Sequence, residues 1–193
     1  MTTQMSNYFR YGNAECVVLD VTAEPFDPAS LGFETFGARS DCWRGYVATF
    51  GLSKLHLVLD TLRIDTPPGA DPREPTGPAI NGVTPWGNSL QRPNFNNHYE
   101  GINYDLDFTG GIVIGDQPMW TRVWQLGSLQ TWDCGIVFEL VFENGRLIRE
   151  IDHSTHMRRF RQERDSNSQW EVEDYRAFGQ RVIASLNQKY RYY

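Results

Sequence analysis

The sequence predicts a mainly β (α+β) fold: one antiparallel sheet, curved or sandwich-like, with one amphipathic C-terminal helix and a long Pro-rich loop. Three observations predict it. Apolar and polar residues alternate over several short segments, which is the period of half-buried strands. After residue 170 the apolar residues recur at spacings of three and four, which is the period of a helix. Between residues 65 and 98 no periodicity remains, and prolines are concentrated there.

The first hairpin is predicted over residues 45–64, "GYVATFGLSKLHLVLDTLRI". Two alternating apolar runs flank Ser53-Lys54, which reads as a two-residue turn. Phe50 then pairs with Leu57, and the apolar residues of both strands share one face. The other face is mixed, as expected for an antiparallel sheet that is covered on one side.

The second hairpin is predicted over residues 137–152, "VFELVFENGRLIREID", around an Asn-Gly turn. A plain two-residue loop would set Glu139 opposite Glu150, and like charges directly opposite each other repel. A type I turn with Gly145 as a bulge instead pairs Glu139 with Arg149, so the bulged register is predicted. Further strands are predicted at residues 16–21, 102–114 and 120–126.

The C-terminal helix is predicted over residues 170–189. Just before it, "MRRFRQER" is predicted to be a solvated segment that offsets an acidic body. The alternative is that Arg158 and Arg159 contact a phosphate or an acidic partner. "DHSTH" places His153 and His156 three residues apart, and it is predicted to be an ordinary polar strand end.

The loop over residues 65–98 is predicted to be docked, because Trp86 and Phe95 need burial. These two residues and the neighbouring Tyr99 are the predicted walls of a ligand site.

The stretch "NHYEGINYDLDFTGG", residues 97–111, holds the most suggestive polar cluster. Strict alternation places Asp105 and Asp107 on the wet face of a strand, and this is the predicted role of both. The alternative is an acid–base site of a small hydrolase or lyase that joins His98 and Glu100 to the two aspartates. No metal site and no cofactor are predicted.

Composition limits the function classes. The chain has 193 residues, which suits a single domain over residues 1–193, and its net charge of −6 makes a broad nucleic-acid surface unexpected. Three dispersed cysteines, no secretory leader and no long apolar run predict a soluble cytoplasmic protein without a membrane span. The sequence contains no GxSxG elbow, Walker loop, HExxH or dinucleotide fingerprint.

The segments "CWRGYVATF", "KLHLVLD" and "FTGGIVIG" resemble a group of small uncharacterised bacterial β-rich proteins. The shared motifs are an Arg-Gly-Tyr strand, a Lys-Leu return strand and a later Thr-Gly strand, which are structural. The resemblance covers part of the chain and implies a bacterial or phage β-rich protein, but no activity.

The resulting functional prediction is a binding protein without catalysis, either an inhibitor or immunity-type protein or a ligand-sequestering one. Its partner would be a protein or a small molecule. The hydrolase or lyase described above is the alternative.

Overall fold

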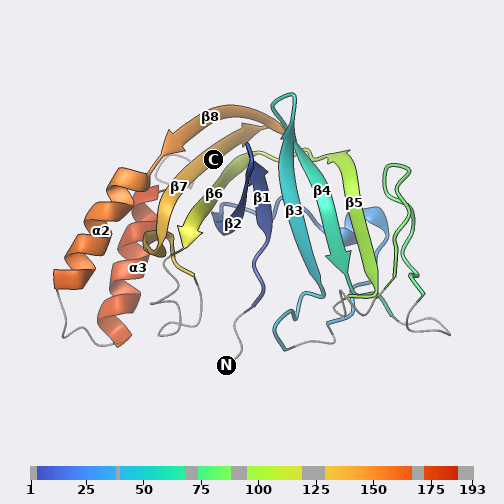
Figure 1. Cartoon of the computed structure of the whole chain (residues 1–193), viewed down its shortest axis with the longest axis horizontal. Helices are drawn as coiled ribbons and strands as arrows, with labels where there is room; N and C mark the ends of the chain where they lie inside the picture. The colour runs from blue at the N-terminus through green and yellow to red at the C-terminus, as the bar shows by residue number, and fades with distance from the viewer. Residues whose placement is uncertain are drawn as a thin grey trace.

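The computed structural model describes residues 4–37, 40–67, 74–87, 95–118, 129–166 and 172–186. These residues form one eight-stranded sheet, two 3-10 turns and two helices, as Figure 1 shows. The strands are β1 (Tyr8–Tyr11), β2 (Ala14–Val21), β3 (Tyr46–Ser53), β4 (His56–Ile64), β5 (Asn97–Asp105), β6 (Gly110–Pro118), β7 (Cys134–Glu143) and β8 (Arg146–Asp152). The 3-10 turns are η1 (Pro28–Leu31) and η2 (Thr131–Asp133), and the helices are α2 (Ser154–Ser166) and α3 (Val172–Leu186).

The sheet curls back on itself, which the arch of strands in Figure 1 makes visible. Its order is β3-β1-β2-β6-β7-β8-β4-β5, and β3 also pairs with β4. The junction of β4 with β8 is a single bridge between His56 and Arg146. The predicted mainly β, curved class is confirmed. The sheet is mixed rather than wholly antiparallel, because β1 and β3 run parallel.

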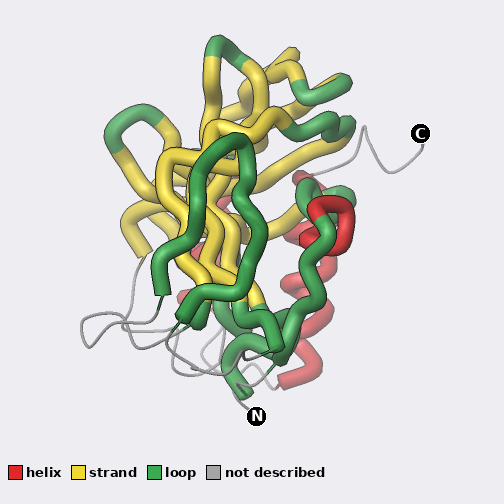
Figure 2. The backbone as a smooth tube through the Cα atoms, turned by 90° about the vertical axis from the view of Figure 1, so that its right-hand side faces the viewer, coloured by secondary structure: helices red, strands yellow, loops and turns green. Residues whose placement is uncertain are grey.

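The inner face of the curl holds the main core. Its centre consists of fully buried aromatic and aliphatic side chains from six strands: Phe9, Phe50, Leu57, Leu59, Leu62, Tyr99, Ile112, Ile114, Leu140 and Phe142. The outer face is covered at β6 and β7 by α2 and α3, through a second cluster that contains Trp132, Val137, Met157 and Val182. Figure 2 shows the helices on one side of the curled strands.

The first hairpin exists, but its turn is one residue later than predicted. Lys54 and Leu55 are the turn residues, with φ of 50° and 68°, and Phe50 pairs with Leu59 rather than with Leu57. The shift is two over Phe50–Ser53, which keeps those side chains on their predicted face, and a bulge in β4 makes it three over Tyr46–Thr49. Leu55, predicted on the apolar face, is exposed in the turn. A residue of β8 holds this turn in place, since Leu147 N–H donates to the Leu55 carbonyl at 2.8 Å. The sequence pattern of the hairpin alone cannot predict a contact with a distant strand.

The second hairpin also exists, and its predicted register is wrong. The Asn-Gly turn is a plain two-residue loop, and the extra residue is Ile148, between the pairs Val141–Arg149 and Phe142–Leu147. Glu139 therefore faces Ile151. A bulge does separate Glu139 from Glu150, as the charge argument required, but it lies within β8 and not in the turn.

Three further expectations are corrected or limited. The strand predicted at 102–114 is two strands, β5 and β6, because the chain leaves the sheet at residues 106–109 and re-enters it between β2 and β7. The basic segment predicted to be solvated lies in the helix α2, and two of its arginines, Arg161 and Arg164, are buried. The predicted C-terminal helix is confirmed as α3, whereas residues 120–126 lie outside the described part of the chain. In that described part, no helix is long and apolar enough to cross a membrane.

Candidate functional site

The outer face of β4 and β5 carries a row of aromatic and basic side chains near the loop end of the molecule. Arg63 on β4 lies directly opposite His98 on β5, and opposite residues point to the same face. Trp86 joins the row because its backbone exchanges two hydrogen bonds of 3.0 Å with His98. We call the group formed by Tyr8, Arg63, Trp86, Phe95 and His98 the Arg63 surface.

Stacked rings form one side of the Arg63 surface. The Trp86 and His98 rings are nearly parallel, with centroids 4.3 Å apart and planes 12° apart. Phe95 meets His98 edge-on at 6.5 Å. The His98 Nε2 lies 3.0 Å from the Phe95 carbonyl oxygen, and a carbonyl oxygen only accepts, so Nε2 carries the proton. The imidazole is therefore held in one tautomer and one orientation.

The backbone at Phe95 is strained. Its φ is 73°, in the left-handed region that bulky residues avoid. Its side chain is nevertheless buried, in a small cluster with Cys42 and Val47. Strain of this kind costs about 1–3 kcal/mol and persists only where the surroundings enforce it. Here it delivers the carbonyl that orients His98.

Arg63 forms the centre of the surface. Its guanidinium carbon lies 5.9 Å from the centroid of the Tyr8 ring, and the residue is half-buried. Within the described ranges, no carboxylate lies in ion-pair distance of Arg63 and no group accepts a hydrogen bond from it. Other arginines on this side are already engaged: Arg10 pairs with Asp60 at 2.7 Å. The Arg44 guanidinium donates to two backbone carbonyls and to an asparagine oxygen.

A polar network docks the described part of the long loop and so positions Trp86. Asn97 donates to Thr66 Oγ1 at 2.8 Å and accepts from the Gly77 N–H at 2.7 Å. Tyr99 donates to the Pro78 carbonyl at 2.8 Å. A Cβ on Gly77 would lie only 2.2 Å from the Tyr99 hydroxyl, so the loop can approach this closely only with glycine there. The predicted docking of the loop therefore holds for the residues described.

The residues predicted as ligand walls divide into two groups. Trp86 and Phe95 belong to the Arg63 surface. Tyr99 is fully buried in the main core and points to the opposite face of β5, where burial raises its pKa. Tyr99 holds the loop through its hydrogen bond to Pro78. It is a structural residue, although the sequence analysis predicted it as part of a ligand site.

The alternative acid–base set is not brought together. His98 and Glu100 lie at the start of β5, whereas Asp105 is its last residue and Asp107 follows it. The partners of His98 and Asp105 on β4 are Arg63 and Val58, so at about 3.3 Å per residue roughly 15 Å of sheet separates them. Both aspartates are exposed, as predicted, but only Asp105 lies in a strand, because β5 ends there and Asp107 is in the following loop. The hydrolase or lyase hypothesis stays a prediction without an assembled site among these four residues.

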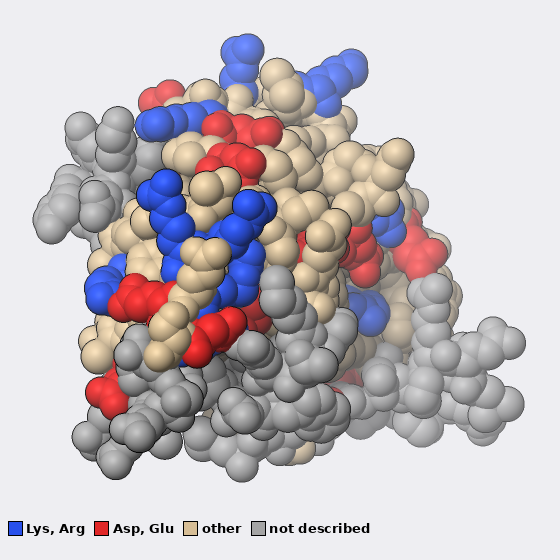
Figure 3. Space-filling view, turned by 60° about the vertical axis from the view of Figure 1, so that its left-hand side comes forward, with Lys and Arg blue, Asp and Glu red and all other residues tan. Residues whose placement is uncertain are grey.

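Arg158 and Arg159 are exposed on the outward side of α2, on another part of the molecule. Figure 3, which brings this side forward, shows basic and acidic side chains interspersed rather than a uniformly basic face. A mixed surface of this kind does not have the electrostatic footprint of a nucleic-acid site. A role for the two arginines in ligand binding stays a prediction.

A second polar cluster lies where β8 passes into α2. The prediction of an ordinary polar strand end at His153 and His156 is wrong, because β8 ends at Asp152 and α2 begins at Ser154. Their neighbour Glu139 was not among the predicted site residues. His153 Nε2 lies 2.8 Å from the Glu139 carboxylate, and the Glu139 side chain is 2% exposed. Next to it, His156 Nε2 contacts Ser185 Oγ of α3 at 3.2 Å. Burial, His153 and Arg159 lower the pKa of His156. The missed signal was Glu139 itself, a lone charge between Val137 and Val141 in a strand that is apolar on both faces.

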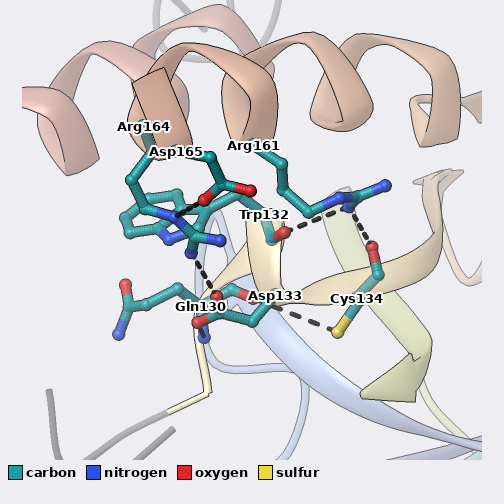
Figure 4. Close-up of polar contacts among 7 residues, drawn as sticks. All are labelled: Gln130, Trp132, Asp133, Cys134, Arg161, Arg164 and Asp165. Carbon is teal, nitrogen blue, oxygen red and sulfur yellow. Dashed lines mark hydrogen bonds and ion pairs between the residues drawn. The ribbon is translucent and has the colours of Figure 1, made fainter. Parts of the chain in front are cut away.

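Two arginines fasten α2 to the sheet, as Figure 4 shows. Arg161 donates to the carbonyls of Trp132 and Cys134 at 3.0 and 2.5 Å. Arg164 pairs with the buried Asp133 at 2.7 Å. These contacts pair the Asp133 carboxylate and the Trp132 and Cys134 carbonyls, and both arginines are buried, so we assign them a structural role.

The pocket between the helices, the cysteines and the acidic side chains provide weaker candidates for a functional site than the Arg63 surface. A pocket of about 290 Å³ lies between α2 and α3, lined by Glu163, Asp174, Ala177, Phe178 and Arg181. The Arg181 side chain already pairs with Glu163 and lies over the Phe178 ring. All three cysteines are buried, and burial raises the pKa of each thiol, which disfavours nucleophilic chemistry. In the described ranges, no group of three or more His, Cys, Asp and Glu side chains could hold a metal ion.

Comparison of the chain with protein-family models, with curated proteins and with solved structures gives no match. The chemistry of the Arg63 surface therefore has to be argued from its own side chains.

Proposed function

We propose that this chain is a binding protein without catalytic activity, which captures an anionic small molecule at the Arg63 surface. Of the predicted forms, the ligand-sequestering one fits this surface, and the cytoplasm is its proposed location. One observation carries the proposal: a half-buried arginine, flanked by aromatic rings, pairs with no carboxylate among the described residues.

The charge balance strengthens that observation. Acidic residues outnumber basic residues 24 to 18, so carboxylates are in excess over the whole chain. The neighbouring Arg10 does have a carboxylate partner. A partly desolvated guanidinium with unused donors is costly, and an anion from outside would satisfy them. The rings beside Arg63 would at the same time bury the apolar part of such a ligand.

The test is a set of nuclear magnetic resonance titrations of the isotope-labelled protein with three probes: inorganic phosphate, benzoate and phenyl phosphate. We expect at least one probe to shift the backbone signals of residues 63 and 98 in a saturable way. Arg63→Met should weaken that binding by roughly tenfold or more, because a hydrogen bond to a charged group contributes about 1.5–3 kcal/mol.

The matched control is Arg149→Met, which removes an exposed arginine from β8 on a different part of the sheet. It should leave binding unchanged. If no probe binds, or if Arg63→Met and Arg149→Met behave alike while both spectra stay well dispersed, the proposal is wrong.

A further inference from the structure

Among the described residues, the Arg63 surface offers a single guanidinium for a ligand. Arg10 is occupied by Asp60, and Arg44 is occupied by the Tyr46 and Met5 carbonyls and by Asn7. Arg63 is thus the guanidinium left for a ligand among the described residues of this face. One guanidinium fork matches one carboxylate, with two parallel N–H to oxygen contacts.

The surroundings are unfavourable for a ligand of higher charge. The chain as a whole carries −6. A phosphate monoester has a charge of about −1.5 to −2 at neutral pH, so it would meet more repulsion here than a carboxylate with a single charge. The electrostatics therefore select a monoanion.

The rings select the rest of the ligand. Tyr8 lies on one side of Arg63, and His98 lies opposite Arg63 on β5 with Trp86 stacked on it. His98 is buried, so the partly exposed Tyr8 and Trp86 are the rings that a ligand can reach. Aromatic side chains favour flat partners in offset-stacked or edge-on arrangements. Phe95 is buried behind His98 and keeps that ring from turning away.

We infer that the ligand of the Arg63 surface is an aromatic monocarboxylate, whose carboxylate pairs with Arg63 and whose flat ring packs against the neighbouring aromatic side chains. The inference rests on the proposed function and narrows it from anions in general to one chemical class.

The experiment compares four probes that each change one property. Benzoate has the ring and a single charge, cyclohexanecarboxylate keeps the charge without the flat ring, benzamide keeps the ring without the charge, and phenyl phosphate raises the charge. Dissociation constants come from nuclear magnetic resonance titration of the whole chain. The variants are Arg63→Lys and Arg63→Met, with Arg149→Met as the control.

We expect benzoate to bind most tightly, cyclohexanecarboxylate several-fold more weakly, and benzamide not at all. Arg63→Lys should weaken benzoate binding although the charge is kept, because lysine lacks the planar fork. Arg63→Met should weaken it further, and Arg149→Met should have no effect.

The outcomes separate the two levels of the proposal. If phenyl phosphate binds more tightly than benzoate and still depends on Arg63, the anion site stands and the aromatic monocarboxylate is wrong. Cyclohexanecarboxylate that binds as tightly as benzoate would also overturn the aromatic monocarboxylate while leaving the anion site in place. If no probe depends on Arg63, both levels fail.

Discussion

At the scale of single residues, the buried Glu139 shows how one charge constrains its neighbourhood. Its carboxylate is hydrogen-bonded to His153 at 2.8 Å, and His153 stands immediately before α2. The His153 N–H also donates to the Val137 carbonyl at 2.8 Å. The position where α2 leaves the sheet is therefore set by a polar pair rather than by apolar packing.

This pairing predicts a strongly non-additive response. His153→Leu leaves a buried carboxylate without its histidine and should lower the free energy of unfolding by about 3–5 kcal/mol. The double variant Glu139→Leu with His153→Leu should be more stable than the single one, because the buried charge is gone. Urea denaturation measures both, with the exposed Glu143→Gln as the control at under about 0.5 kcal/mol. Additive losses would contradict this account of the pair.

The cysteines give a prediction with a pH direction. Burial is the first cause that raises the pKa of Cys16 to about 11 and that of Cys134 to about 12, from an ordinary 9.0. The folded state thus favours the protonated thiols. Their contribution to stability is complete below pH 9 and is lost as the pH rises through 9 toward 12.

A disulfide reagent that reports free thiols should find almost none in the native protein at pH 8 and all three after denaturation. In the native protein, reaction should accelerate only well above pH 9. Rapid modification of one thiol at pH 8 would show that it is exposed or activated.

At the scale of elements, α2 is a helix attached by polar groups. Its buried residues are Met157, Arg161 and Arg164, which lie on one side at spacings of four and three. Only the methionine is apolar. Arg164→Met should cost about 3–5 kcal/mol, because Asp133 stays buried after its cation is removed. Arg161→Met should cost about 1–3 kcal/mol through the two carbonyls that lose their donor.

Thermal or urea denaturation of these variants provides the measurement, with the exposed Arg158→Met as the matched control in the same helix. Its effect should stay within about 0.5 kcal/mol. Equal effects of all three substitutions would mean that the contacts drawn in Figure 4 do not fasten the helix.

The same helix explains where sequence reasoning stopped. Periodicity predicted both hairpins and α3, because their buried sides are apolar. Periodicity did not predict α2, because the buried side of that helix consists mainly of arginines. A run of basic residues is normally interpreted as a solvent-exposed segment. The hairpin registers depended on contacts from distant strands, such as the bond between Leu147 and Leu55. For the proposed site, the loop pattern pointed to Trp86 and Phe95, whereas Arg63 is recognised only from the pairing of β4 with β5 and from the Tyr8 ring of β1 beside it.

At the scale of the whole molecule, the curl of the sheet is closed by the turn between β7 and β8. The Gly145 N–H donates to the Phe108 carbonyl at 2.9 Å, and its own carbonyl accepts from Leu57 N–H at 2.8 Å. The turn thus joins β4, the chain after β5 and the second hairpin at one point. Gly145 has a φ of 75°, and a Cβ there would lie 2.4 Å from the Leu106 carbonyl oxygen.

Gly145→Ala should therefore destabilise the closed sheet as well as strain the turn. To relieve the clash between the new Cβ and the Leu106 carbonyl oxygen, the turn has to move away from the chain that follows β5. Gly12→Ala is the matched control: its φ is 58°, and a Cβ would meet nothing within 4 Å. The left-handed conformation alone costs an alanine about 1–2 kcal/mol, so Gly12→Ala should lose about that much. Gly145→Ala should lose clearly more, and hydrogen exchange should accelerate first in β4 and β8, where the sheet closes. If the two alanine variants are equally stable and exchange alike, the turn at Gly145 does not hold the closed sheet together.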